Sequence, residues 1–244
     1  MAGYYVGTSG WSYDPWNGNF YPCAQLAVGS FNRYASQFSA LETSVILYHA
    51  FTDTNCFKWR RQAGPGFRYA LKIPPAITHQ RLLANIESEI SAFWSSVCLL
   101  GDRLGAVLLQ VSPNQPMDLG WLRAVLQAFG DPSRVAVELR TPTWQNEDVR
   151  RQLEVVGAAC VNTDSPHNRL NEWVTGRRAY IRLHGRRHWY ADSYSGEELA
   201  SISKLVQRMT ARGAEEIYIF FNNDIGGDAA SNALALKGML GVNS

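Results

Sequence analysis

Short apolar segments alternate with segments of helical spacing along the chain. The apolar segments, which we expect to be strands, cover residues 4–7, 41–48, 67–73, 104–111, 134–139, 158–163, 179–184 and 216–221. The amphipathic segments, which we expect to be helices, cover residues 29–38, 53–62, 80–99, 118–129, 147–156, 196–212 and 229–240. Residues 165–177 have little helical pattern, which predicts an irregular crossover after the sixth strand. This alternation indicates a parallel α/β fold, and the strand count favours a closed, TIM-barrel-like (β/α)8 barrel.

A second pattern is the polar or ionisable residue at the end of most apolar segments. In a parallel barrel all strand C-termini open on one face, and that face carries the chemistry. Because side chains alternate along a strand, one set should point into the barrel. The expected interior residues are Glu42, Ser44, Ile46, Tyr48, Arg68, Ala70, Lys72, Gln110, Ala136, Glu138, Arg140, Cys160, Asn162, Asp164, Tyr180, Arg182 and His184. Buried charges are costly unless paired, and here acids and bases nearly balance.

Composition limits the size and the partners of the molecule. A (β/α)8 barrel takes about 250 residues, so we expect one domain over residues 1–244. The net charge of +2 provides no global field that would attract nucleic acid or an anionic membrane. The four cysteines have no CxxC spacing, and we expect them to be reduced. The absence of a signal peptide and of a long apolar segment predicts a cytoplasmic protein without membrane contact.

The sequence contains no motif for a cofactor or a metal. No GxGxxG follows the first strand and no Walker A loop is present, which disfavours a nucleotide-binding open sheet. Glu138, Asp164 and His184 are possible ligand types, but HxH and HExxH spacings are missing and nearby arginines would repel a divalent cation. We therefore expect neither a metal nor a cofactor.

Several motifs occur in a fixed order along the chain. They are Gly7-Thr8-Ser9-Gly10-Trp11-Ser12-Tyr13 with Trp16 and Phe20-Tyr21-Pro22, Lys72 with Thr78-His79, Ala136-Val137-Glu138 with Arg140 and Trp144, Asp164-Ser165-Pro166, Arg182-Leu183-His184-Gly185 with Tyr190 and Tyr194, and Phe221-Asn222-Asn223-Asp224 with Ala229 and Asn232-Ala233. Together they resemble the YecE-like family, also called domain of unknown function 72. The resemblance implies a TIM-barrel-like fold and supplies no established activity.

Two positions depart from the pattern of the family that the chain resembles. The family usually has an Asn-containing stretch after Glu42, where this chain has Thr43-Ser44-Val45. A His often follows the strand-five arginine, where this chain has Thr141. These departures favour a substrate or an activity that differs from that of the relatives.

The preferred functional hypothesis is an enzyme that uses acid–base chemistry at the barrel mouth, of hydrolase, lyase or isomerase type. Glu138, Asp164 and His184 come from three consecutive strands, and histidine is the natural proton shuttle near neutral pH. The expected substrate is a small anionic or polar molecule. The expected substrate-binding residues are Lys72, Arg140 and Arg182 as anion holders, with Trp11, Gln110, Tyr190, Tyr194, Asn222, Asn223 and Asp224. An inert network of ion pairs is the alternative interpretation of the same charges.

Other interpretations stay open. Glu138 with Asp164 or Glu42 would suit a glycosidase-like hydrolase, with aromatic residues stacking on sugar rings. Lys72 could form a Schiff base, although a lysine beside carboxylates is more often an ion pair. The Asn222-Asn223-Asp224 loop with Gly226-Gly227 could bind phosphate or be a turn.

A non-catalytic module that binds nucleic acid or a small ligand is the further alternative. Its expected contacts are Arg177, Arg178, Arg186, Arg187, His188, Trp189 and Tyr190. The small net charge disfavours nucleic acid, and the sequence does not predict an oligomeric state.

Overall fold

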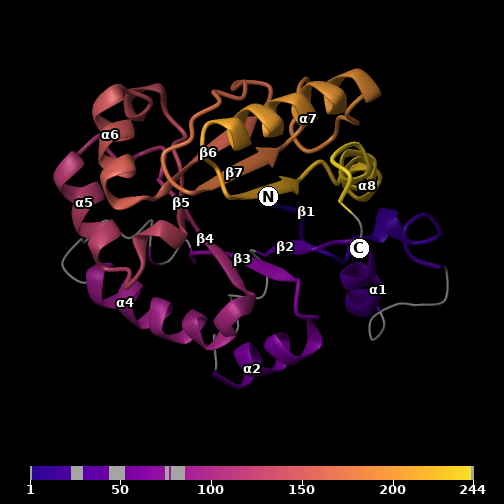
Figure 1. Cartoon of the computed structure of the whole chain (residues 1–244), viewed down its shortest axis with the longest axis horizontal. Helices are drawn as coiled ribbons and strands as arrows, with labels where there is room; N and C mark the ends of the chain where they lie inside the picture. The colour runs from indigo at the N-terminus through magenta and orange to yellow at the C-terminus, as the bar shows by residue number, and fades with distance from the viewer. Residues whose placement is uncertain (1, 23–29, 44–52, 75–76, 78–85, 243–244) are drawn as a thin grey trace.

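Eight parallel strands form a closed barrel, and helices surround it (Figure 1). The computed structural model describes residues 2–22, 30–43, 53–74, 77 and 86–242. Each strand pairs in parallel with its neighbours in the sequence, and β1 also pairs with β8, which closes the ring. The predicted closed parallel barrel is confirmed.

The strands are β1 (Gly3–Ser9), β2 (Ala40–Thr43), β3 (Arg68–Lys72), β4 (Leu104–Gln110), β5 (Val135–Glu138), β6 (Ala159–Asp164), β7 (Arg178–Leu183) and β8 (Glu216–Phe221). The α-helices are α1 (Ser30–Gln37), α2 (Asp53–Gln62), α4 (Ile86–Val97), α5 (Leu119–Gln127), α6 (Glu147–Val156), α7 (Gly196–Ala211) and α8 (Asp228–Met239). Short 3-10 helices are η1 (Asp14–Trp16), η4 (Cys98–Arg103), η5 (Pro132–Arg134) and η6 (Pro142–Trp144). Within the described residues, no helix is both long and apolar enough to cross a membrane.

The predicted elements are found wherever the structure describes them, with ends that differ by a few residues. Residues 165–177 contain neither helix nor strand, so the irregular crossover after β6 is confirmed. Residues 29, 44–48 and 80–85 of predicted elements, which include Ser44, Ile46 and Tyr48, lie outside the described residues.

Local capping residues explain where two helices begin and end. At α7, the Ser195 hydroxyl accepts from the Glu198 backbone N–H, and the Glu198 carboxylate accepts from the Ser195 N–H. This reciprocal pair is a capping box. Helix α6 begins at Asn146, which accepts from the Val149 N–H, and ends at Gly157 in the left-handed conformation (φ 72°). The caps fix where the chain leaves each helix toward the next strand.

The middle of the barrel is apolar, with small side chains opposite aromatic rings. The buried interior residues are Ala40, Ala70, Ala106, Leu108, Ala136, Ala159, Val161, Tyr180, Tyr218 and Phe220. The alanines come from β2 to β6 and the rings from β7 and β8, and such pairing of small and large groups gives close packing. The polar residues Glu42, Gln110, Glu138 and Arg182 lie farther along their strands, toward the C-terminal mouth, whereas Arg68 begins β3 at the other end.

The face of β6 that enters the barrel is opposite to the predicted one. Ala159 and Val161 belong to the interior cluster, whereas Cys160 packs in the core between barrel and helices. Asn162 hydrogen-bonds to the backbone of the crossover that follows β6. The prediction that Cys160, Asn162 and Asp164 face the interior is therefore wrong. Both faces of this strand are buried, so alternation alone does not tell which face points inward.

Candidate functional site

Arg182 of β7 joins two buried carboxylates across the barrel mouth. Its Nη2 lies 2.8 Å from Oε1 of Glu42 on β2, and its Nε lies 3.0 Å from Oε2 of the same residue. Its Nη1 lies 2.8 Å from Oε1 of Glu138 on β5. All three side chains are at most 5% exposed. A single guanidinium thus links β2, β5 and β7, in the bidentate geometry that arginine favours.

Glu42 is held in its ionised form. The Ser9 and Tyr180 hydroxyls each donate to it at 2.6 Å, in addition to Arg182. Burial alone would raise the pKa of Glu42, but the Arg182 charge and these hydrogen bonds outweigh it and lower the pKa below its usual value. Glu42 is therefore a structural carboxylate rather than a group that exchanges a proton near neutral pH.

Glu138 is likewise ionised and has more partners. The Gln110 amide donates to it, Arg140 Nε lies at 3.4 Å, and the Thr163 hydroxyl at 3.5 Å. Burial acts to raise the pKa of Glu138, but the charges of Arg182 and Arg140 hold it well below the usual value. A general base is most effective with a pKa near the working pH, so Glu138 suits an electrostatic anchor better than the predicted base.

His184 follows β7 and is buried beside Glu138. Its Nδ1 lies 3.1 Å from the Asn222 amide nitrogen, so in this arrangement Nδ1 accepts and the neutral ring carries its proton on Nε2. Nε2 lies 3.7 Å from Glu138 Oε1, which is longer than a hydrogen bond. Burial and the charge of Arg182 lower the pKa of His184, although Glu138 opposes them. The imidazole is therefore neutral at pH 7.

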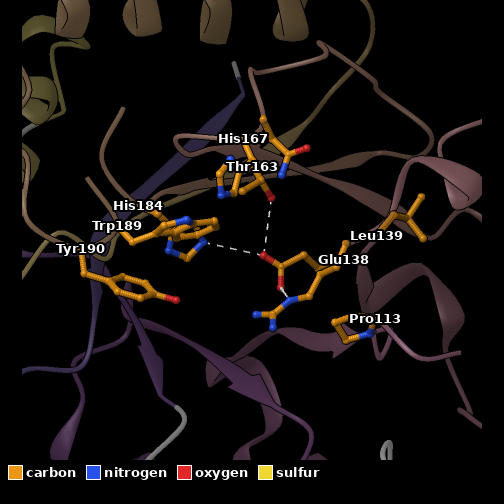
Figure 2. Close-up of a pocket in the computed structure, with 10 residues that line it drawn as sticks. Pro113, Glu138, Leu139, Thr163, His167, His184, Trp189 and Tyr190 are labelled. Carbon is orange, nitrogen blue, oxygen red and sulfur yellow. Dashed lines mark hydrogen bonds and ion pairs between the residues drawn. The ribbon is translucent and has the colours of Figure 1, made fainter. Parts of the chain in front are cut away.

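A pocket of about 300 Å³ opens beside His184 and Glu138. It is lined by Pro113, Glu138, Leu139, Arg140, Thr163, His167, Asn168, His184, Trp189 and Tyr190. Figure 2 shows Trp189 and Tyr190 on one side of Glu138, with Pro113 and Leu139 on the other. The His184 ring contacts both aromatic rings, each with a centroid separation of 5.4 Å. The pocket therefore combines the aromatic rings of Trp189 and Tyr190 with the charged side chains of Glu138 and Arg140.

The two aromatic residues of the pocket belong to the loop between β7 and α7, which internal hydrogen bonds hold in place. The Asp192 carboxylate accepts from the backbone N–H groups of Arg187 and His188, which closes the loop on itself. The Tyr190 N–H donates to the His184 carbonyl at 2.7 Å, and Tyr190 has a left-handed backbone (φ 63°). A left-handed conformation is uncommon for a bulky residue and persists where its surroundings impose it. The loop thus fixes where the Tyr190 ring lies.

The predicted site residues fall into three groups. Glu138, Arg140, His184 and Tyr190 line the pocket, and Gln110, Arg182 and Asn222 contact its lining residues from behind. Lys72 ends β3 at the same mouth but does not line the pocket. The residues placed elsewhere are Asp164, Tyr194, Asn223, Asp224 and Trp11.

Each of the residues placed elsewhere has a contact of its own. Asp164 pairs with Arg186 (2.8 Å) on the helix side of β6, so the predicted grouping of Glu138, Asp164 and His184 is not found. The Tyr194 hydroxyl accepts from the Gly185 N–H, and the Asn223 amide donates to the Asp192 carbonyl. Asp224 accepts from Trp16 Nε1 at 3.0 Å. Trp11 packs edge-on against Phe31.

Five pocket residues were not predicted, namely Pro113, Leu139, Thr163, His167 and Asn168. Thr163 follows from the reversed face of β6. His167 and Asn168 lie in a turn in which Ser165 and Asn168 exchange backbone hydrogen bonds. The Ser-Pro-His-Asn composition predicts such a turn but gives no sign that it lies beside a pocket.

Metal ligation has no support in the described part of the chain. Among those residues, no three His, Cys, Asp or Glu side chains group as the ligands of an ion would. The charges at the mouth are instead arranged as ion pairs between arginines and carboxylates.

Comparison with known proteins gives consistent matches over most of the chain. A family model described as "Protein of unknown function DUF72" matches residues 5–244. The UPF0759 protein YecE of Escherichia coli (strain K12) is 26% identical over 167 residues, which are 66% of this chain and 59% of that protein. That match therefore spans less than two thirds of the curated relative.

Two further matches extend over nearly the whole chain. The UPF0759 protein YunF of Bacillus subtilis (strain 168) is 24% identical over 272 residues, covering 98% of this chain and 95% of that protein. The crystal structure of a DUF72 family protein from Thermotoga maritima is similar with a TM-score of 0.85 and 26% identity, covering 98% of this chain and 99% of that one. None of these names states a reaction.

Proposed function

The chain belongs to the DUF72 family of proteins of unknown function, and from this premise we propose that the barrel mouth is the active site of an enzyme that transfers a proton on a small anionic substrate. Arg140 holds the anion, His184 transfers the proton, and Glu138 is the ionised carboxylate that positions both. The observation that carries this proposal is the presence of Arg140, Glu138 and His184 in one pocket.

Arg140 suits an anion holder because its charge is not fully used inside the protein. Its side chain is 39% exposed, whereas that of Arg182 is 5% exposed. Its contact with Glu138 runs through Nε at 3.4 Å, and Nη1 and Nη2 have no hydrogen bond to any described residue. Two free N–H groups of one guanidinium match the two oxygens of a carboxylate or phosphate.

His184 suits the proton-transfer group because it is neutral and held in one tautomer. A neutral imidazole with its proton on Nε2 can donate that proton to a substrate and take it back at the same nitrogen. Asn222 fixes Nδ1, and the Nε2 edge has no closer described partner than Glu138 at 3.7 Å. Because the Asn222 amide occupies Nδ1, the proton that His184 can give to a bound substrate is the one on Nε2.

Two alternative functions have less support. A glycosidase needs one carboxyl group that keeps its proton, whereas Glu42 and Glu138 both have a pKa below the usual value. A nucleic-acid-binding surface needs unpaired basic residues. Each of the candidate basic residues already has an acidic partner: the pairs are Arg177–Glu215, Arg178–Glu216, Arg186–Asp164, Arg187–Asp192 and His188–Asp192.

The test is a thermal-shift screen with inorganic phosphate, sugar phosphates and short carboxylic acids. A ligand that binds only the folded state stabilises it by about 2.7 kcal/mol at 100 times its Kd. We expect a stabilising anion whose effect is lost in Arg140→Gln and kept in Arg151→Gln. Arg151 is 70% exposed on α6 and pairs with Glu147, so it controls for the loss of one surface charge.

A sugar phosphate or carboxylic acid that stabilises the protein then tests the role of His184. Incubation in D₂O, followed by proton NMR of the ligand, reports exchange of a carbon-bound hydrogen. We expect exchange with the wild type and Arg151→Gln, and binding without exchange in His184→Gln. Stabilisation that survives Arg140→Gln, or exchange that survives His184→Gln, would contradict the proposal.

A further inference from the structure

Lys72 is a cationic residue at the barrel mouth to which the proposed function assigns no role. It is the last residue of β3, in register with Leu108 of β4. Ala70, two residues earlier, lies in the interior cluster. Alternation therefore directs the Lys72 side chain toward the interior side of the mouth, where it is partly buried.

Among the side chains that the structure describes, none forms a hydrogen bond or an ion pair with the Lys72 ammonium group. Glu42 and Glu138 are near enough to act on it electrostatically. Their oxygens are already occupied by Arg182, by the Ser9 and Tyr180 hydroxyls, and by the Gln110 amide. The lysine therefore stands beside two carboxylates whose hydrogen-bonding capacity is used elsewhere.

The surroundings of Lys72 favour its neutral amine form. Burial lowers the pKa of Lys72, and the charges of Arg182 and Arg140 lower it further, more than Glu42 and Glu138 raise it. A lysine that is partly desolvated beside other cations is activated as a nucleophile, because the amine and not the ammonium carries the lone pair. Of these two arginines, Arg140 lines the pocket and is available to attract an anion.

A role for Lys72 in the same site rests on the proposed function and extends it. We propose that Lys72 forms a Schiff base with a small carbonyl compound that carries a carboxylate or phosphate group. The Lys72 nitrogen bonds to the carbonyl carbon as the C=O π bond opens, and one N–H proton passes to the oxygen, which gives a neutral carbinolamine. Its hydroxyl then takes up a proton from solvent and leaves as water when the C–O bond breaks, and the nitrogen lone pair forms the C=N bond of an iminium ion. Arg140 holds the anionic group of the same molecule, so the substrate class is a 2-oxo acid or a phosphorylated aldehyde or ketone.

The sequence makes the test simple because the chain has four lysines, Lys58, Lys72, Lys204 and Lys237. The folded protein is incubated with glyoxylate and, separately, glyceraldehyde 3-phosphate, each with sodium cyanoborohydride. This reagent reduces an imine to a stable secondary amine, and peptide mass mapping then locates the adduct. We expect faster modification at Lys72 than at exposed Lys58 and Lys204, because a lower pKa leaves a larger fraction of the amine neutral.

Two variants supply the controls. Lys72→Arg keeps the charge, cannot form an imine, and should lose the adduct while anions still raise its melting temperature. Lys204→Arg removes an exposed lysine of α7 and should keep the Lys72 adduct. The ratio of the glyoxylate rate to the rate with the neutral probe acetaldehyde should be higher at Lys72 than at exposed Lys58, and Arg140→Gln should lower it to the Lys58 value.

The outcomes separate this inference from the proposed function. Equal modification of Lys72, Lys58 and Lys204, with anion stabilisation intact, would overturn the Schiff base and leave the proposed function standing. A glyoxylate-to-acetaldehyde rate ratio at Lys72 no higher than that at Lys58 would overturn the anionic substrate class. Absence of both the adduct and the anion stabilisation would overturn the two proposals together.

Discussion

Asp224 is a buried carboxyl group whose two oxygens have different surroundings. Oδ1 accepts a hydrogen bond from Trp16 Nε1, whereas Oδ2 has no partner among the described residues. Burial raises the pKa of Asp224 from 3.8 to about 7, Asp228 adds to the rise, and Trp16 opposes it. This group therefore titrates close to physiological pH.

The charged form of Asp224 should destabilise the fold. Between pH 4 and pH 7 the folded state binds more protons than the unfolded state, so its stability falls as the pH rises. A pKa near 7 corresponds to at most about 4 kcal/mol lost above that pH. We expect Asp224→Asn to raise the melting temperature at pH 8 and to change it little at pH 4, as measured by calorimetry.

An exposed acid provides the control for Asp224→Asn. Asp102 is 62% exposed, and Asp102→Asn should produce no gain that grows from pH 4 to pH 8. A gain in Asp224→Asn that is equal at both pH values would show that the charge of this carboxylate is not the cause.

At the residue scale, the position of a polar residue at the end of a strand predicted several of the residues that line the pocket. Glu138, Arg140 and His184 are polar residues at the ends of β5 and β7, and they meet as expected. Asp164 also ends a strand, but its side chain faces the helices and pairs with Arg186. The sequence does not reveal this because a carboxylate can be satisfied on either face of a strand when an arginine is near.

The element that shapes the pocket is the loop between β7 and α7. Its first turn depends on Gly185, which has a left-handed backbone (φ 93°). A Cβ at this position would lie 2.6 Å from the His188 carbonyl oxygen, too close for any side chain. The loop that carries Trp189 and Tyr190 therefore requires glycine at its start.

We expect Gly185→Ala to weaken both the fold and the pocket. The left-handed conformation costs a non-glycine residue about 1–2 kcal/mol, before the clash with His188 is counted. Urea unfolding should show a loss of at least that size, and anion-induced stabilisation should fall. Gly196→Ala is the matched control because Gly196 begins α7 with open space around its Cα. A loss in Gly185→Ala no larger than in Gly196→Ala would show that the loop adapts.

At the scale of elements, periodicity identified the strands and helices because each helix buries one face against the barrel. The crossover at residues 165–177 was also predicted from its lack of pattern. The inward face of β6 was not predictable, since Ala159 and Cys160 are both small and buried. The alternation of side chains does predict the inward face of β5 and β7, because there charged residues alternate with apolar ones.

The molecule as a whole has a barrel with two interior layers. The lower layer is apolar and made of alanines against the rings of β7 and β8. The upper layer contains the Glu42–Arg182–Glu138 network, which connects β2, β5 and β7. Two carboxylates share one buried guanidinium, so removal of that cation leaves two buried negative charges.

Arg182→Met therefore tests whether this network supports the closed barrel. Breaking a buried ion pair from one side costs about 3–5 kcal/mol, and urea unfolding at pH 8 should show a loss of that size. The loss should shrink at pH 5, because without Arg182 burial raises the pKa of both carboxyl groups and they take up protons. Arg177→Met, in an exposed pair with Glu215, is the control and should cost about 0–1 kcal/mol. Equal losses of unfolding free energy in the two variants would show that the buried charges at the mouth do not stabilise the closed barrel.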